Sequence, residues 1–213
     1  MLVSGSLATK PDRMVATSEP IELAGPKPRF VSRGGDKLDA VLEEFAIDVT
    51  GIRCLDIGAS TGGFTDCLLQ RGAAEVVAAD VGHGQLDWRL RNQSRVTVLE
   101  RTDVRDLTPT AVGNVGLVTV DVSFISLRSV LESVGKVSGG ADVLALVKPQ
   151  FEVGRRNVPK GGVVRDPALQ ARAVADVASA AERVGFVCRG AMASPITGTH
   201  GNREYFLWLG RAR

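Results

Sequence analysis

The chain has 213 residues, 44% of them hydrophobic, and a formal net charge of +2. This length and composition suffice for one globular domain with a full core and argue against intrinsic disorder. The nearly balanced charge means that any nucleic-acid-binding surface must be local.

Cysteine, histidine and hydropathy patterns narrow the class of protein further. The three cysteines form no C-x-x-C pair, and the two histidines are widely separated. We therefore expect reduced thiols and no metal site. No apolar run approaches the roughly 20 residues that span a bilayer. The first residues also lack the basic and apolar regions of a signal peptide. We expect a cytoplasmic protein without membrane contacts, and a monomer.

Residues 1–28 differ in composition from the rest of the chain. Short apolar pieces at Leu2-Val3 and Ile21-Glu22-Leu23 predict a small β-rich segment, which is too short to build a core alone. Gly25-Pro-Lys-Pro28 reads as a linker, because two prolines in four residues prevent a helix. We therefore place the main domain at residues 29–213.

The main domain opens with a predicted helix over Asp36–Ile47. Its apolar residues recur on one face at Leu38, Val41, Leu42 and Phe45. Arg33 and Lys37 lie at its start, where the helix dipole disfavours a cation. Lys37 is therefore a candidate for a role other than a solvated surface lysine.

A glycine-rich turn follows the first predicted strand, Ile52–Ile57, and precedes a helix over Phe64–Arg71. This order of elements is typical of a nucleotide-type cofactor site. Ser60 replaces the second glycine of the dinucleotide motif, and Asp56 does not suit a pyrophosphate. Asp56 suits instead a cationic amine, such as the methionine part of S-adenosylmethionine (SAM). The predicted cofactor-binding residues of this stretch are Asp56, Gly58, Ser60, Gly62 and Gly63.

Further strands alternate with helices and predict a doubly wound parallel sheet. The expected strands are Ala74–Val81, Val96–Leu99, Val115–Val120 and Val143–Val147. Ligands bind outside the carboxyl ends of such strands. Four charged residues are predicted at those ends: Asp56, Asp80, Asp121 and Lys148. We expect Asp80 to accept ribose hydroxyls.

The stretch Gln150–Asp166 is predicted to be a long loop. From Lys148 to Arg165 the chain has five basic residues and one acid. Either this is an ordinary solvated loop or, as we favour, it binds phosphate groups. The candidate residues are Arg155, Arg156, Lys160 and Arg165.

The last elements predict an antiparallel hairpin. After a helix over Ala168–Arg183, strands at Phe186–Pro195 and Arg203–Leu209 are joined by a short glycine-containing turn. The expected fold is α/β, with a seven-stranded, mostly parallel sheet that ends in a hairpin. This arrangement favours Rossmann-like SAM-dependent methyltransferases over dehydrogenases.

Four motifs now point to one family. Leu55-Asp-Ile-Gly-Ala-Ser-Thr-Gly-Gly-Phe-Thr, Val120-Asp-Val-Ser-Phe-Ile-Ser, Leu146-Val-Lys-Pro-Gln-Phe-Glu and Gly201-Asn-Arg-Glu-Tyr occur in this order. Together they resemble the FtsJ-like ribose 2′-O-methyltransferases, most closely the TlyA branch, which is often labelled hemolysin. The resemblance covers about Arg29 to Leu209.

The resemblance implies roles for particular residues. Lys37, Asp121, Lys148 and Glu204 would form a catalytic tetrad, with Lys148 as the base and Glu204 paired with Lys37. Asp103 would accept the adenine amino group of SAM, and Arg33 would join the substrate-binding residues. The implied substrate is rRNA or a ribosomal subunit, with a cytidine of 16S or 23S rRNA as the target. An S4 RNA-binding domain precedes the enzyme in this branch, so residues 1–28 are expected to be the remnant of such a module and its linker.

Three other functions compete with this interpretation. A small-molecule methyltransferase on the same fold is disfavoured by the basic loop and the second lysine. A non-enzymatic membrane-active hemolysin is disfavoured because no amphipathic or apolar segment is evident. A dinucleotide-dependent oxidoreductase is disfavoured by Asp56 and Ser60. The lysines and carboxylates of the tetrad could also be simple surface ion pairs.

Overall fold

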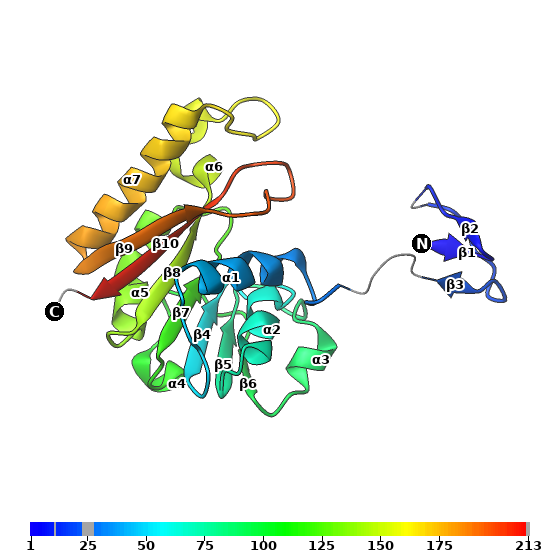
Figure 1. Ribbon diagram of the computed structural model, residues 1–213, viewed down its shortest axis with the longest axis horizontal. Coiled ribbons are helices and arrows are strands. Elements are labelled where there is room, and N and C mark those ends of the chain that lie inside the picture. The colour runs from blue at the N-terminus through cyan, green and yellow to red at the C-terminus, as the bar shows by residue number, and fades with distance from the viewer. Residues whose placement is uncertain (11, 23–27, 212–213) are drawn as a thin grey trace.

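The computed structural model describes residues 1–10, 12–22 and 28–211. Its main sheet has seven strands in the order β6-β5-β4-β7-β8-β10-β9 (Figure 1). Strands β4 to β8 pair in parallel, whereas β10 pairs antiparallel with both β8 and β9. The predicted fold is therefore confirmed. The strand bounds are β4 Arg53–Ile57, β5 Glu75–Ala79, β6 Val96–Leu99, β7 Leu117–Val120, β8 Asp142–Val147, β9 Phe186–Ala193 and β10 Tyr205–Arg211.

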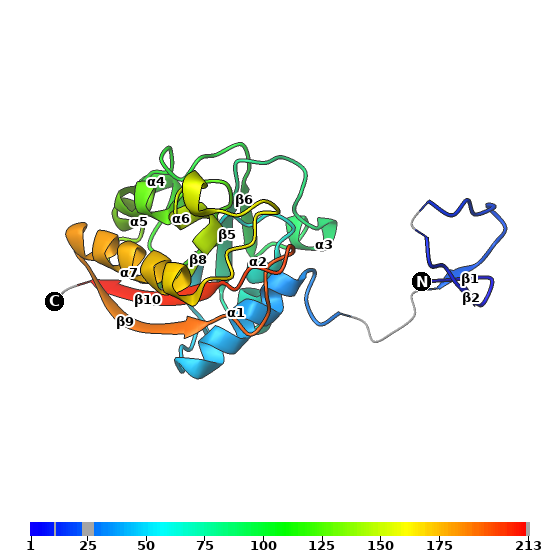
Figure 2. The same ribbon diagram turned by 90° about the horizontal axis from the view of Figure 1, so that it is seen from above.

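Helices cover both faces of this sheet. Seen from above (Figure 2), α1 and α7 lie on opposite sides of the β9–β10 hairpin. The helix bounds are α1 Arg33–Glu44, α2 Gly63–Gln70, α3 Trp88–Arg91, α4 Pro109–Val112, α5 Leu131–Val137, α6 Pro149–Glu152 and α7 Pro167–Arg183, with 3₁₀ turns η1 Leu127–Ser129 and η2 Arg155–Asn157.

The two faces have separate cores, because successive strand residues point to opposite sides. In β8, Val143, Ala145 and Val147 belong to one core, together with residues of α5 and α7. Leu144 and Leu146 belong to the other, with residues of α1 and α2. The same alternation decides which strand-end side chains can reach a ligand.

The amino-terminal segment forms its own small sheet in the order β2-β1-β3. Its strands are Leu2–Val3, Ser6–Leu7 and Ile21–Glu22. The expectation of a β-rich segment is thus confirmed. Leu23 and Gly25-Pro-Lys27 of the predicted strand and linker lie outside the described residues.

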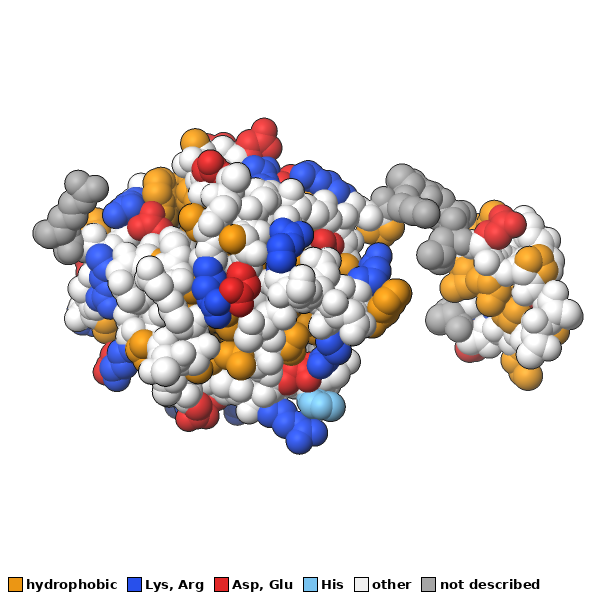
Figure 3. All heavy atoms as spheres, turned by 90° about the horizontal axis from the view of Figure 1, so that it is seen from below, with side chains coloured by type: hydrophobic (Ala, Val, Ile, Leu, Met, Phe, Trp, Pro, Cys, Tyr) orange, Lys and Arg blue, Asp and Glu red, His pale blue; other side chains and the backbone are white. Residues whose placement is uncertain are grey.

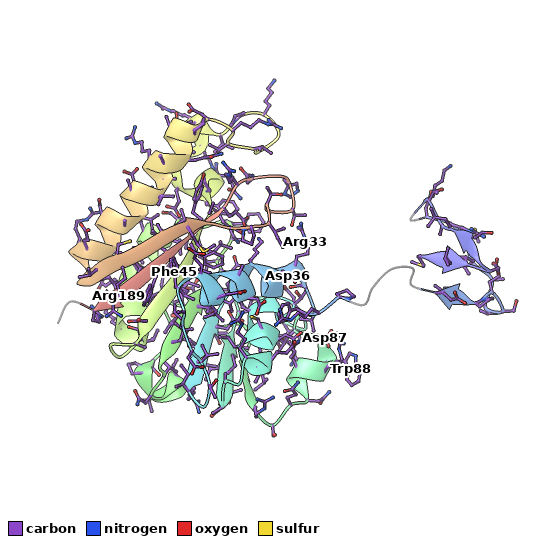
Figure 4. The ribbon with its side chains drawn as sticks, in the orientation of Figure 1. Arg33, Asp36, Phe45, Asp87, Trp88 and Arg189 are labelled. Carbon is purple, nitrogen blue, oxygen red and sulfur yellow. The ribbon has the colours of Figure 1, made fainter. Side chains whose placement is uncertain are left out.

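Helix α1 begins three residues before its predicted start. The Gly34-Gly35 pair, which precedes the predicted helix, is itself helical and serves packing. A Cβ on Gly35 would lie 2.2 Å from the Phe30 ring. Along the same helix, Figure 4 shows Arg33 at the start and Phe45 at the far end. There Phe45 packs on Trp208 of β10, with ring centroids 5.4 Å apart.

Other local predictions need correction at short elements. The predicted loop Gln150–Asp166 contains most of α6 and the η2 turn. Helix α3 begins at Trp88, because Asp87 accepts a hydrogen bond from the Arg89 N–H and caps the helix there. Helix α4 is an element that the sequence does not predict. None of the helices among the described residues has the length and hydrophobicity required to cross a bilayer.

Candidate active site

Two neighbouring cavities open at the carboxyl ends of the parallel strands. The larger, about 460 Å³, is lined by residues that follow β4, β5, β6 and β7. The smaller, about 230 Å³, is lined by the start of α1, the glycine-rich turn and Thr199. Gly58, Ser60 and Asp121 line both cavities. The turn and the end of β7 are therefore the wall that the cavities share.

The shared wall requires glycine at position 58. Gly58 has a φ of 84°, and a Cβ there would lie 2.4 Å from the Asp121 carbonyl oxygen. Any side chain would push β4 and β7 apart at the site. Gly63 lines the smaller cavity, and its missing Cβ would lie 2.2 Å from Ser32 Oγ. Gly62 begins α2 with a φ of 97° and is not among the residues that line either cavity.

Asp80, which follows β5, accepts hydrogen bonds from the backbone and stabilises the glycine-rich turn after β4. Its Oδ2 accepts a hydrogen bond from the Ser60 N–H at 2.8 Å, and its Oδ1 accepts one from the Gly82 N–H at 2.6 Å. The carboxylate also lines the larger cavity. This is the position expected for an acceptor of ribose hydroxyls.

Asp56 does not reach either cavity. Leu55 and Ile57 point to one core, so Asp56 points to the opposite face, beneath α2, and is 0% exposed. Its carboxylate accepts hydrogen bonds from Thr65 Oγ1 at 2.7 Å and Thr119 Oγ1 at 2.9 Å. Burial raises the pKa of Asp56 to about 6, although these hydrogen bonds oppose that shift. In the described residues, Asp56 therefore ties β4 to β7 and α2, and it does not line either cavity.

Asp103 lines the larger cavity, as expected for a cofactor-binding residue. Its carboxylate accepts hydrogen bonds from Arg105 Nε at 2.8 Å and Nη2 at 2.6 Å. Hydrogen bonds from the Arg105 side chain and backbone lower the pKa of Asp103 to about 2. The carboxylate is ionised at neutral pH and keeps acceptor capacity for an amino group.

Lys148 and Asp121 meet at the ends of the adjacent strands β8 and β7. Lys148 is 8% exposed, and its Nζ lies 2.6 Å from Asp121 Oδ1. Within the described residues, that oxygen is buried without a hydrogen bond of good geometry. A buried acceptor without a directed partner is costly unless a ligand completes it. The Asp121 side chain as a whole is 24% exposed and lines both cavities, so it can also contact a bound molecule.

Lys37 and Glu204 form the second pair of the predicted tetrad. Lys37 Nζ donates to Glu204 Oε2 at 2.6 Å, and both residues are buried. Gly198 makes room for this carboxylate, since a Cβ there would lie 2.4 Å from Glu204 Oε1. Because α1 begins at Arg33, Lys37 lies in the second turn and not, as predicted, in the first, where the helix dipole would disfavour it. Lys37 and Asp121 both line the smaller cavity.

The predicted substrate-binding residues fall into two groups. Arg33 lines the smaller cavity and donates to Thr199 Oγ1 at 3.2 Å; Figure 4 shows it beside the turn between β9 and β10. Arg155, Arg156, Lys160 and Arg165 are exposed on the segment between β8 and α7, near the top of Figure 1. None of these four lines either of the two cavities.

The opposite end of the sheet has a different surface. Figure 3 views the molecule from below, the end where α4 precedes β7. Lys and Arg side chains are interspersed there with Asp and Glu. That end therefore presents mixed charge, whereas the stretch from Arg155 to Lys160 has basic residues and no acidic ones.

Sequence reasoning missed several polar residues that shape the site. Ser123 accepts a hydrogen bond from Lys148 Nζ at 2.6 Å. Asn202 joins the basic segment to the hairpin turn through the Val164 N–H and the Gly162 carbonyl. Glu152 accepts from Ser126 Oγ and the Leu127 N–H. All three lie within the quoted motifs, which is the signal that could have found them.

The larger cavity fits the adenosine and methionine parts of SAM. Carboxylates at Asp80 and Asp103 can accept ribose and amino hydrogens, and apolar walls are provided by Val81, Val104 and Ile125. Asp121, which also contacts Lys148, lines both cavities. This donor and acceptor set suits a nucleoside ligand with a cationic amine.

Solved structures with the same fold define the class of protein. A protein from Listeria monocytogenes, labelled a SAM-dependent methyltransferase, superimposes with a TM-score of 0.61 at 13% identity, covering 84% of this chain and 99% of that one. At this identity the likeness shows the fold alone. The architecture is that of Rossmann-like SAM-dependent methyltransferases.

Sequence comparison then gives the family. Residues 30–211 match the FtsJ-like methyltransferase family, and the chain belongs to it. The chain is 56% identical to the 16S/23S rRNA (cytidine-2′-O)-methyltransferase TlyA of Mycobacterium tuberculosis over 210 residues, which are 97% of this chain and 78% of the relative. A structure from Streptococcus thermophilus, labelled a hemolysin, has a TM-score of 0.84 at 42% identity and covers 91% of this chain and 71% of that one. The expected TlyA-type membership, methyltransferase activity and SAM cofactor are confirmed.

Proposed function

We propose that this enzyme methylates a ribose 2′-hydroxyl of rRNA. The observation that carries the proposal is the pair of buried lysines, Lys37 and Lys148, each in contact with a carboxylate at 2.6 Å. Lys37 lines the smaller cavity, and Lys148 lines neither cavity but contacts Asp121, which lines both. Isolated surface ion pairs contribute little and do not require burial. Two lysines buried beside a cofactor cavity fit instead a reaction that moves one proton and creates negative charge on oxygen.

The larger cavity would hold SAM, and the smaller would admit the target nucleotide. SAM supplies an activated methyl group, so the protein mainly positions its partners and removes one proton. Lys148 would accept the proton of the ribose hydroxyl. Lys37, fixed by Glu204, would stabilise the negative charge that develops on the ribose oxygen. Asp121 would hold Lys148 and face the methionine end of the cofactor.

RNA binding would be provided by residues beyond the two cavities. Arg155, Arg156, Lys160 and Arg165 are exposed cations that can contact phosphates. Arg33 lies at the mouth of the smaller cavity, where it can contact the target nucleotide. Residues 1–28 would be the end of an S4-like RNA-binding module, and residues 29–213 the methyltransferase domain. We expect a monomeric cytoplasmic enzyme that acts on rRNA or ribosomal subunits.

The M. tuberculosis relative is named for a cytidine in 16S and 23S rRNA, and we propose the same base here. The test uses tritiated SAM with naked 16S rRNA, naked 23S rRNA and isolated subunits, followed by mapping of the modified nucleotide. Methyl incorporation at a cytidine ribose supports the proposal. Transfer to a small-molecule extract with none to any rRNA or subunit would contradict it.

A further inference from the structure

Ser123 lies between β7 and η1, on the segment that lines the larger cavity. Its Oγ accepts a hydrogen bond from Lys148 Nζ at 2.6 Å. Ser123 is exposed, whereas Lys148 is only 8% exposed. The hydroxyl therefore connects the buried lysine amine to the wall of the larger cavity, the one proposed for SAM.

The two contacts of Lys148 differ in kind. Asp121 Oδ1 lies 2.6 Å from the amine, but this oxygen has no well-directed hydrogen bond within the described residues. An ion pair whose angles are poor for a hydrogen bond attracts the amine but does not fix its rotation about the Cε–Nζ bond. The hydrogen bond to Ser123 meets the angular requirement and so defines one N–H direction.

We propose that Ser123 is a positioning residue that aims the Lys148 amine at the ribose hydroxyl. The inference rests on the proposed function. A neutral lysine amine has two N–H bonds and one lone pair. With one N–H directed to Ser123, the second N–H and the lone pair occupy the two remaining tetrahedral positions, and attraction to Asp121 favours the N–H on the carboxylate side.

The reaction balances through that lone pair. The ribose O–H proton moves to the Lys148 nitrogen while the ribose oxygen forms a bond to the methyl carbon. The carbon–sulfur bond breaks, and its electron pair stays on sulfur, which becomes a neutral thioether. Lys148 then carries the positive charge and releases its proton to solvent before the next turnover.

The backbone around Ser123 supports a fixed position. The next residue, Phe124, has a φ of 66°, a left-handed conformation that non-glycine residues adopt only where the surrounding structure holds it. Just beyond it, Ser126 and the Leu127 N–H are held by the buried Glu152. Glu152 follows Lys148 by four residues, so the serine segment and the lysine segment are tied together twice.

The test compares Ser123→Ala and Ser123→Thr in single-turnover methyl transfer to rRNA at saturating SAM. We expect the alanine variant to lose about 10- to 100-fold in rate, since small misplacements of a reacting group have effects of this size. Because SAM is saturating, a change in SAM affinity does not enter this rate, and the affinity for rRNA should be unchanged. The threonine variant keeps the hydroxyl and should recover most of the rate. Ser129→Ala is the control, because Ser129 donates to the Ser126 carbonyl and not to Lys148.

The possible outcomes separate this inference from the proposed function. Wild-type rate in Ser123→Ala, alongside an inactive Lys148→Ala, would overturn the role of Ser123 alone. Equal loss in the alanine and threonine variants would also overturn it, because the hydroxyl would then be irrelevant. A wild-type enzyme that transfers no methyl group to rRNA would instead refute the proposed function.

Discussion

Lys148 is the residue on which the proposed chemistry depends most. Replacement by alanine should abolish methyl transfer and leave SAM affinity nearly unchanged, because Lys148 does not line the larger cavity. Replacement by arginine should fail almost as badly, since a guanidinium does not give up its proton in proteins. Calorimetry with SAM and single-turnover transfer across pH check both expectations. An arginine variant that keeps most of the rate would show that Lys148 acts only through its charge.

Asp56 gives a prediction about stability. Its pKa is about 6 in the folded protein and near 3.8 when unperturbed. Between these values the folded state binds more protons than the unfolded state. Asp56 therefore stabilises the fold most below pH 4, and this contribution is lost as pH rises through about 6.

Asp56→Asn removes that titration while keeping the size of the side chain. Relative to the wild type, the variant should gain stability as pH rises from 4 to 7, by up to about 3 kcal/mol in the free energy of unfolding. Urea denaturation at several pH values measures this difference. A difference that stays constant across the range would mean that the carboxyl does not titrate as described.

Asp56 also shows what the sequence leaves undecided at the scale of single residues. Three members of the tetrad, Asp121, Lys148 and Glu204, could be predicted because they lie in motifs that resemble the family. Lys37 lies outside those motifs, and only its place near the start of a predicted helix made it a candidate. Asp56 also lies near a strand end, but the alternation of side chains turns it toward α2. A shift of one position along a strand moves a side chain to the opposite face of the sheet. The residues of the cofactor motif do not indicate on which face the Asp56 side chain lies.

At the scale of elements, Glu152 joins α6 to the segment before η1. Its side chain is 1% exposed and lies 3.3 Å from Arg128 Nε, in addition to its contacts with Ser126 and the Leu127 N–H. Glu152→Gln should lower the free energy of unfolding by about 1–3 kcal/mol, since a charged acceptor with several donors is replaced by a neutral amide. It should also slow methyl transfer, because the connection between the ends of β7 and β8 is weakened.

The matched control is Glu132→Gln on α5. Glu132 forms an exposed pair with Lys136 at i,i+4, so its removal should change stability by less than about 0.5 kcal/mol. The thermal unfolding midpoint and the single-turnover rate of methyl transfer are measured for both variants. If the two substitutions have equal effects, Glu152 does not connect the strand ends in the way described.

The basic segment after β8 gives an element-scale prediction about RNA. Arg155→Glu with Arg156→Glu should weaken rRNA binding and reduce the salt dependence of the affinity, by about one unit of log–log slope for each phosphate that is no longer neutralised. SAM affinity should not change. Lys136→Glu, which alters an exposed cation on α5, is the control. Equal weakening by the control would indicate an effect of net charge only.

Long elements could be predicted from the sequence, and short ones could not. Strands β5 and β8 have sustained apolar runs, and α7 has a repeated apolar face. Helix α6 has four residues, too few to show a helical period. Its existence depends on tertiary contacts such as those of the buried Glu152.

At the scale of the whole molecule, the division at residue 28 is open to test. A variant that begins at Arg29 keeps the described strands of the main sheet and both cavities. We expect it to retain its thermal unfolding midpoint and SAM affinity. Fusion to a complete S4 domain should increase methylation of rRNA without changing SAM affinity. Loss of SAM binding on removal of residues 1–28 would show that this segment is part of the methyltransferase domain.

The wall that the two cavities share has a consequence for inhibition. The wall formed by Gly58, Ser60 and Asp121 separates the cavity proposed for SAM from the cavity proposed for the target nucleotide, so one compound could span both spaces. A 5′-thioadenosine whose sulfur is joined to a second nucleoside by a short tether would engage the two cavities at once. Once the adenosine part has bound, the tether keeps the second nucleoside close to its cavity. The compound therefore binds more tightly than either part alone, without additional contacts. Because the tether must pass beside Gly58, selectivity would come from the geometry of this wall rather than from the adenosine pocket.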